Sequence, residues 1–288
     1  MNRIFSEISK YIVSLIMMML ILLTAVSLFI KLTLLNESYY KRVFGSEVYI
    51  SRVMGDLKEN MQVFAVTNAV SYEIVEKNLN EALVKEQIDN NMSSILSFLK
   101  SNDETYKSAG NIDELNKFKE SMAKDIKEKY PYAKDAEIKS AVTEAVRVID
   151  NNCSFFDFSR VSSAGAVKSV RRVFNMVDKL YFTPVLLFMV VIFLFLFKSR
   201  GYELGERLLW TGSGILAAAL ILVIPSAMLL AFKIPDRLAV DIEHVNYAVK
   251  TFLTFFGEFF LIFGVVMTVA GIILMGMRFH RKLSPGLS

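Results

Sequence analysis

The sequence predicts an all-α membrane protein with four transmembrane helices and a helical-bundle extracytoplasmic domain inserted between helices 1 and 2. Three observations lead to this fold class. The chain has 288 residues, of which 53% are hydrophobic, above the roughly 45–50% of soluble domains. Its charged share of 22% is too high for a chain that lies in the membrane throughout. The apolar residues gather in four runs, and most charged residues lie between the first two.

Each apolar run is long enough to cross a bilayer, whose hydrocarbon core takes about 20 apolar residues. The predicted transmembrane helices are residues 11–31, 180–197, 208–232 and 259–277. The first run could also be a signal peptide, because Arg3 and Lys10 precede its apolar core. The run continues past its only small-residue stretch, around Ala25, so we expect an uncleaved anchor.

Basic residues predict the orientation of the chain. Lysine and arginine are in excess in the tail 1–10, the loop 198–207 and the tail 278–288, whereas the loop 233–258 balances its basic residues with acidic ones. Short cytoplasmic segments carry this excess. We therefore expect a multi-pass plasma-membrane protein with both termini in the cytoplasm, and the Ile-, Lys-, Asn- and Phe-rich composition indicates a bacterial source.

The segment 32–179 then forms the extracytoplasmic domain, and its pattern is helical. Apolar residues recur every three to five positions over 71–100, and similar stripes follow up to Pro131 and over 138–149. A further stripe over 167–177 is expected to continue into the second span, and the residues after 31 to continue the first span outward. The loop 151–160 contains Phe155, Phe156 and Phe158, which either pack beneath the bundle or contact the membrane surface or a partner.

Residues that carry chemistry are sparse. The two histidines, His244 and His280, are predicted on opposite sides of the membrane, so they cannot share a metal ion or a catalytic triad. No nucleotide-binding or hydrolase motif occurs, and Cys153 is the single cysteine. No basic stripe with interleaved aromatic residues predicts nucleic-acid binding. We expect no catalytic residue, no cofactor and no metal.

Small residues in the spans predict close helix packing. Gly257, Gly264 and Gly271 recur every seven residues and so lie on nearly the same helix face, and Gly212 and Gly214 offer a similar surface in 208–232. Small residues let helices approach closely in lipid. The packing is either internal, between the third and fourth spans, or between the subunits of a homo-oligomer.

One carboxylate, Glu258, lies within the apolar stretch FFGEFFLIFG of residues 255–264. Residues 259–277 can cross the bilayer by themselves, so we expect Glu258 at the outer boundary, in a charge cluster with Lys31 and Lys233. The alternative is a buried acid that handles protons or ions.

The arrangement of one span, a large outer domain and three further spans is similar in topology to that of the mechanotransmitting ABC permeases. Such a resemblance implies work with a separate ATPase. The loop 198–207 is shorter than theirs, and their outer domains contain strands. The sequence therefore favours a non-catalytic protein whose extracytoplasmic domain senses, binds or scaffolds a protein partner. The alternative is a component of a transporter or channel, including a mechanotransmitting permease.

Overall fold

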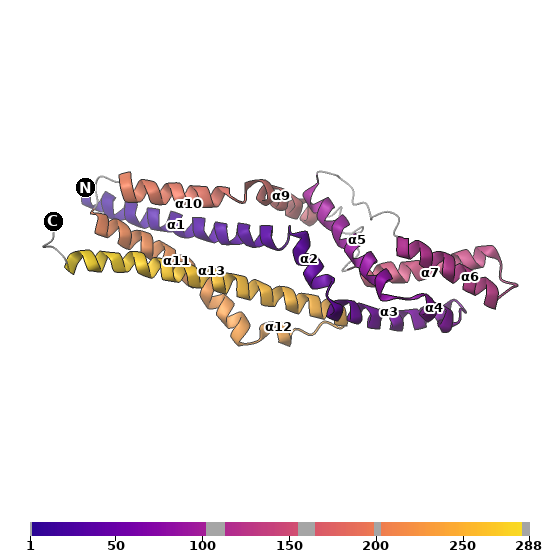
Figure 1. The fold of residues 1–288 in the computed structure, drawn as a ribbon. Coiled ribbons are helices and arrows are strands. Elements are labelled where there is room, and N and C mark those ends of the chain that lie inside the picture. Colours follow the sequence, from indigo (N-terminus) through magenta and orange to yellow (C-terminus); the bar gives the residue numbers. More distant parts are fainter. Residues whose placement is uncertain (1, 102–112, 155–164, 199–202, 284–288) are drawn as a thin grey trace. The chain divides into compact units, whose positions relative to one another are not determined.

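The computed structural model describes residues 2–101, 113–154, 165–198 and 203–283, and every element in these ranges is helical (Figure 1). The elements are α1 (Asn2–Leu32), α2 (Glu37–Phe44), α3 (Glu47–Thr67), α4 (Tyr72–Asn78), α5 (Glu81–Lys100), α6 (Asp113–Lys129), α7 (Asp135–Cys153), α9 (Gly165–Leu180), α10 (Thr183–Phe193), the π-helix η1 (Leu194–Lys198), α11 (Leu204–Ala231), α12 (Ile234–Arg237) and α13 (Glu243–Leu283). They form two compact units. Unit 1 comprises residues 1–34, 176–237 and 252–288, and unit 2 comprises 35–175 and 238–251.

Among the described residues, three helices are long and apolar enough to cross a membrane. Their candidate stretches are Lys10–Leu32, Leu204–Ala231 and Glu243–Arg278. A fourth candidate is a bent pair, Val167–Leu180 and Thr183–Leu196, whose two helices meet at 55°. The sequence predicted a helix that continues from 167 into the second span, and this prediction is wrong. Pro184 lies in the first turn of α10, where its missing N–H needs no partner, so the second helix begins anew there.

Unit 1 is built from α1, α10, η1, α11 and most of α13. At one end of unit 1, an ion pair connects α1 to the start of α11: Lys10 Nζ lies 3.2 Å from Glu206 Oε2. At the same end, Arg207 donates a hydrogen bond to the Leu196 carbonyl at 2.6 Å, which joins η1 to α11. At the other end, an ion pair between Lys31 and Asp178 connects the last turn of α1 to α9.

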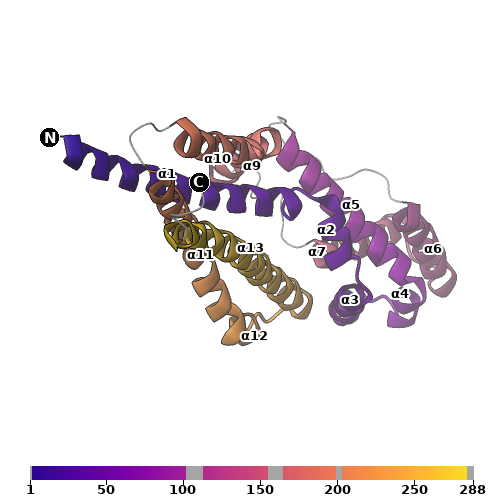
Figure 2. The same ribbon diagram turned by 60° about the vertical axis from the view of Figure 1, so that its left-hand side comes forward.

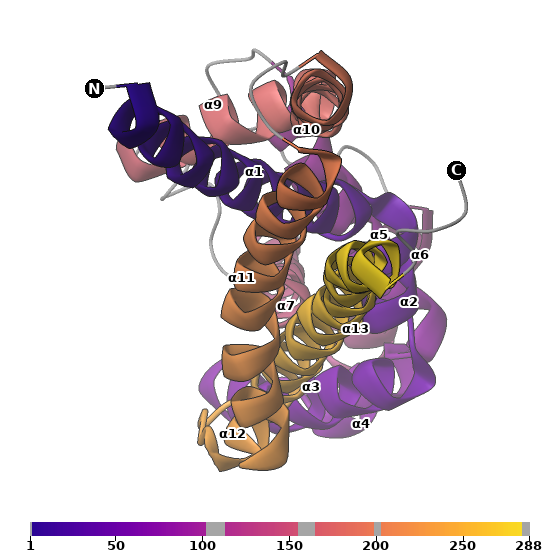
Figure 3. The same cartoon turned by 90° about the vertical axis from the view of Figure 1, so that its left-hand side faces the viewer.

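The core of unit 1 lies where α1, α11 and α13 meet. Ile21 of α1 is buried with Ile215 and Ala218 of α11, and Phe188 of α10 packs against this cluster. Nearer the end of α1, Phe29 lies among aromatic rings of α13 such as Phe260. Figure 3 shows α11 with α1 on one side and α13 on the other.

Unit 2 is a bundle of short helices in which α3 packs against α4, α5 and α7. In Figure 2, α5 lies between α2 and α6, both of which it contacts. The core residues come from several of these helices, and the largest fully buried ones are Tyr49, Leu57, Met61, Leu83, Ile88, Met122 and Ile149. The stripes predicted over 71–100, up to Pro131 and over 138–149 supply Leu83, Ile88, Met122 and Ile149 of this core.

Two predicted helices are interrupted in the structure. The first span does not continue outward, because α1 ends at Leu32 and Asn36 starts α2 by accepting a hydrogen bond from the Ser38 amide at 3.0 Å. The stripe over 71–100 is divided at Leu79, where Asn80 Oδ1 accepts a hydrogen bond from the Leu83 amide at 2.7 Å. Both asparagines are N-caps, which supply an acceptor to amides at a new helix start.

Candidate functional site

The start of α13 is held against α3 by a cluster of polar and aromatic side chains within unit 2, which we call the α13 anchor. On α3, positions 49, 52 and 56 are three and four residues apart, so they share one helix face. On α13, the contributing positions are in the first turn and a half. The anchor consists of Tyr49, Arg52, Asp56, Glu243, His244 and Tyr247.

At the centre of the anchor, His244 binds Asp56 twice. Its Nδ1 lies 2.5 Å from Asp56 Oδ2, and its backbone amide donates to the same oxygen at 3.4 Å. The His244 side chain is only 5% exposed, whereas that of Asp56 is 21% exposed. A buried imidazole needs a polar partner, and Asp56 provides it.

Around this pair, further contacts fix the same turn. Arg52 forms an ion pair with Glu243, and its guanidinium lies 5.3 Å from the centre of the Tyr247 ring. The buried Tyr49 ring meets the His244 ring edge-on at 6.0 Å. Burial raises the pKa of the Tyr49 hydroxyl well above its ordinary value of 10.0. The anchor combines the Arg52–Glu243 ion pair with the two hydrogen bonds between His244 and Asp56, which suits a fixed structural contact.

The anchor offers little access to a substrate, because its histidine is closed to solvent. The Cys153 thiol is also buried, and burial raises its pKa well above the ordinary range, which leaves it a poor nucleophile. Within the described ranges, no group of three or more His, Cys, Asp or Glu side chains could hold a metal ion.

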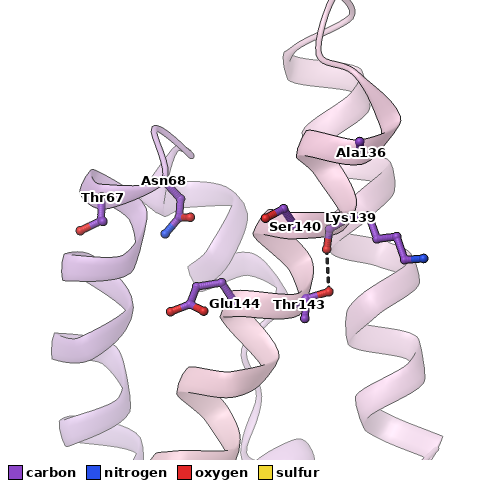
Figure 4. Close-up of a pocket in the computed structure, with 7 residues that line it drawn as sticks. All are labelled: Thr67, Asn68, Ala136, Lys139, Ser140, Thr143 and Glu144. Atoms are coloured by element: carbon purple, nitrogen blue, oxygen red, sulfur yellow. Dashed lines mark hydrogen bonds between the residues drawn. The ribbon is translucent and has the colours of Figure 1, made fainter.

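A surface groove of about 530 Å³ lies between the end of α3 and the start of α7 (Figure 4). Two of its three hydroxyls are used within their own helices: Thr67 donates to the Val63 carbonyl at 2.8 Å and Thr143 to the Lys139 carbonyl at 2.7 Å. Glu144, on the same wall, pairs with Arg147 at 2.6 Å. Asn68 is also bonded within the protein, to the Phe64 carbonyl at 3.1 Å, and we assign no site to the groove.

The structure arranges the predicted charge cluster differently. Lys31 Nζ lies 2.6 Å from Asp178 Oδ1 and 5.2 Å from the centre of the Tyr181 ring. Glu258 is exposed, and among the described residues no ion pair joins it to Lys31 or to the exposed Lys233. The sequence carried the signal for the observed pair, since a lysine ends the first span and an aspartate precedes the second.

The predicted packing glycines lie at helix contacts within unit 1. A Cβ added to Gly212 of α11 would lie 2.9 Å from the carbonyl oxygen of Gly271 of α13. A Cβ on Gly264 would lie 2.6 Å from a methyl of Val223, and one on Gly257 would lie 3.0 Å from the Leu230 side chain.

Gly214 faces the opposite neighbour. A Cβ there would lie 2.7 Å from the carbonyl oxygen of Ser14 of α1. The glycines therefore let α11 approach α13 on one side and α1 on the other. The three phenylalanines proposed as a partner contact, Phe155, Phe156 and Phe158, lie outside the described residues.

Comparison with known proteins adds no relative: no protein-family model, no curated protein and no solved structure matches this chain.

Proposed function

We propose that this chain is a multi-pass plasma-membrane protein with four spans and both termini in the cytoplasm. Unit 2, on the extracytoplasmic side, binds or scaffolds a protein partner without catalysis. A change in unit 2 on binding is passed into the membrane through α13.

The observation that carries this proposal is the continuity of α13. Its first residues belong to unit 2, where the α13 anchor holds them, and the rest belongs to unit 1. The helix has 41 residues without interruption, about twice what one span requires. A continuous helix carries a displacement or rotation of its first turn along its axis more directly than a loop.

The contacts at the ends of unit 1 support the orientation. The start of α1, the end of η1 and the start of α11 meet at one end, through Lys10, Glu206, Arg207 and Leu196. Gly212, near the start of α11, packs against Met275 near the end of α13. The start of α1 and the end of α13 thus lie at the same end of unit 1, which supports both termini on one side of the membrane, and the basic segments predicted from the sequence favour the cytoplasm as that side.

The test starts with identifying the partner. A photo-crosslinking amino acid in place of Tyr132, which is 99% exposed in unit 2, should trap a partner in intact cells. The purified partner is then added to the full chain in lipid nanodiscs while amide hydrogen exchange is measured. We expect altered exchange both in unit 2 and in α13 beyond Thr251.

Asp56→Ala is the matched variant, because it loosens the anchor. It should keep partner binding and lose the response beyond Thr251. Solute flux through liposomes that contain the full chain, alone or with an ATPase that co-purifies, would overturn the proposal in favour of the transporter alternative.

A further inference from the structure

Helix α9 has three distinct faces. The first packs against α5 within unit 2. Val167 and Phe174 pack against the buried cluster of Phe98 and Leu99, and the Arg171 guanidinium lies 4.1 Å from the centre of the Phe98 ring. Arg171 also donates a hydrogen bond to the Ser101 carbonyl at 2.6 Å. This face fixes the rotation of α9 about its own axis.

The second face is apolar and exposed, and we call it the α9 apolar row. It consists of Val170, Val173, Met176 and Leu180, whose exposed fractions are 44%, 45%, 56% and 53%. Steps of three, three and four residues keep these side chains on one side of a helix. Four large apolar side chains in a row on one uninterrupted helix are a surface that water solvates poorly.

The third face is basic and borders the apolar row. It carries Lys168, Arg172 and Lys179, which are all exposed. Steps of four and seven residues keep the three side chains on one side of the helix. A helix with an apolar face beside a basic face is typical of segments that lie at the surface of an anionic membrane.

The end of α9 lies at the level where the first span ends. Asp178, in the last turn of α9, pairs with Lys31 at 2.6 Å, and Lys31 also lies over the ring of Tyr181. Lys31 is in the last turn of the apolar stretch Lys10–Leu32. Lysine and tyrosine at this position are typical of the boundary between hydrocarbon and headgroups. Only residues 181 and 182 separate α9 from the apolar α10 (Figure 1).

We propose that α9 lies in the plane of the membrane surface and binds anionic phospholipid. The α9 apolar row enters the boundary between headgroups and acyl chains, and Lys168, Arg172 and Lys179 contact the phosphate groups. The two helices qualify as a membrane-crossing segment only as a pair, and their 55° bend brings α9 parallel to the surface where α10 is tilted by about 35° from the bilayer normal. The inference rests on the proposed membrane location of the chain and adds a lipid-binding element outside the spans.

Immersion of the row is tested with spin labels on the full chain in nanodiscs of phosphatidylcholine and phosphatidylglycerol. Val173→Cys is labelled in a Cys153→Ala background, and its accessibility to oxygen and to a water-soluble nickel chelate is measured. We expect the label to be more accessible to oxygen than to nickel, at a depth of about 5–10 Å. A label at Val63→Cys, an exposed valine of α3 in unit 2, should show the opposite preference.

A third label separates failure of this inference from failure of the membrane proposal. Ile221→Cys is on α11, in a candidate span, and its native side chain is 49% exposed. If Ile221→Cys is immersed and Val173→Cys is reached by nickel, α9 lies in water and the inference is overturned. If both are reached by nickel, the membrane proposal fails. Protection of Val173→Cys from both reagents would mean that protein covers the row, which also overturns the inference.

The lipid class is tested with Lys168→Gln/Arg172→Gln, because glutamine keeps the helix and removes two charges. Phosphatidylglycerol retention by the purified chain is measured against phosphatidylcholine.

Each basic side chain at an anionic surface contributes about 1 kcal/mol, or about fivefold in affinity. We expect the preference for phosphatidylglycerol to fall by about 25-fold in the double variant, because two such contributions are removed. The control Lys124→Gln/Lys139→Gln removes exposed charges of α6 and α7 and should leave the preference unchanged. An equal loss in both double variants would overturn the assignment to α9.

Discussion

At the scale of single residues, the contacts that decide the structure are partners far apart in the sequence. His244 is 188 residues from Asp56, and Lys31 is 147 residues from Asp178. Neither pair follows from spacing or periodicity within one helix, although Lys31 and Asp178 stand at the ends of the first two predicted spans. The pairs matter because a buried or half-buried charge is costly without a counter-charge or hydrogen bond. They set where the first turn of α13 and the last turn of α9 are held.

Asp56→Ala should loosen the start of α13. The substitution leaves the buried His244 without its acceptor, which costs about 1–3 kcal/mol. Amide hydrogen exchange of residues 243–250 in the full chain should become faster. Arg52→Gln is the matched control, because its pair with Glu243 is partly exposed and such pairs contribute at most about 1 kcal/mol. Equal effects of the two substitutions would contradict the central role of His244–Asp56.

Asp125 should make the stability of unit 2 sensitive to acid. Hydrogen bonds from Asn78 Nδ2 at 2.9 Å and Lys77 Nζ at 3.0 Å lower the pKa of its carboxyl below the ordinary value of 3.8. A lowered pKa in the folded state stabilises the fold fully above the ordinary value. This contribution is lost as the pH falls through the folded-state pKa.

The measurement uses the buried Cys153 as a reporter of opening in unit 2, through its rate of reaction with a disulfide reagent that works in acid. Asp125→Asn should speed the reaction relative to the native chain at neutral pH, and the difference should shrink below pH about 4. Glu120→Gln, an exposed carboxylate of the same helix, serves as the control. A difference that grows on acidification would refute the assigned sign.

At the scale of helices, the sequence predicted where apolar faces lie better than where helices begin and end. The stripes of 138–149 and of the segment up to Pro131 match α7 and α6, because helical periodicity reports directly on burial. The breaks at Asn36 and Asn80 did not follow from periodicity, since the apolar stripe continues across each. An asparagine cap is the local signal that would have revealed them.

Close packing between α11 and α13 should depend on Gly212. An added methyl would meet the backbone of α13 at 2.9 Å, at the Gly271 carbonyl, where it cannot be relieved by a side-chain rotation. We expect Gly212→Ala to lower the unfolding free energy by about 1–3 kcal/mol in detergent. Gly276→Ala on α13 has open space at its Cβ position and should leave stability unchanged or raise it by up to about 1 kcal/mol. Equal unfolding free energies of the two variants would mean that the close contact of α11 with α13 at Gly212 does not contribute to stability.

At the scale of the whole molecule, the proposed topology can be tested by labelling single cysteines in intact cells. Cys153 is buried, so the native chain should give little background with a membrane-impermeant maleimide. Tyr132→Cys in unit 2 should be labelled without lysis, whereas Glu203→Cys at the start of α11 should be labelled only after lysis. The reverse pattern would invert the proposed orientation, and labelling of both in intact cells would exclude a span between them.

The sequence by itself determined the helical class and the apolar stretches that can enter a membrane. Both depend on composition and on periodicity within about 20 residues, which a single segment contains. It also singled out Gly212, Gly257, Gly264 and Gly271, because small residues have few other uses inside an apolar helix.

Only the tertiary structure decided which side chains meet. Glu258 was expected beside Lys31, and the structure pairs Lys31 with Asp178. The start of α13 belongs to unit 2 because His244 finds Asp56 there. Contacts of this kind depend on how helices distant in the sequence are rotated and offset against one another. That geometry is fixed by packing of the whole unit, which no local pattern encodes.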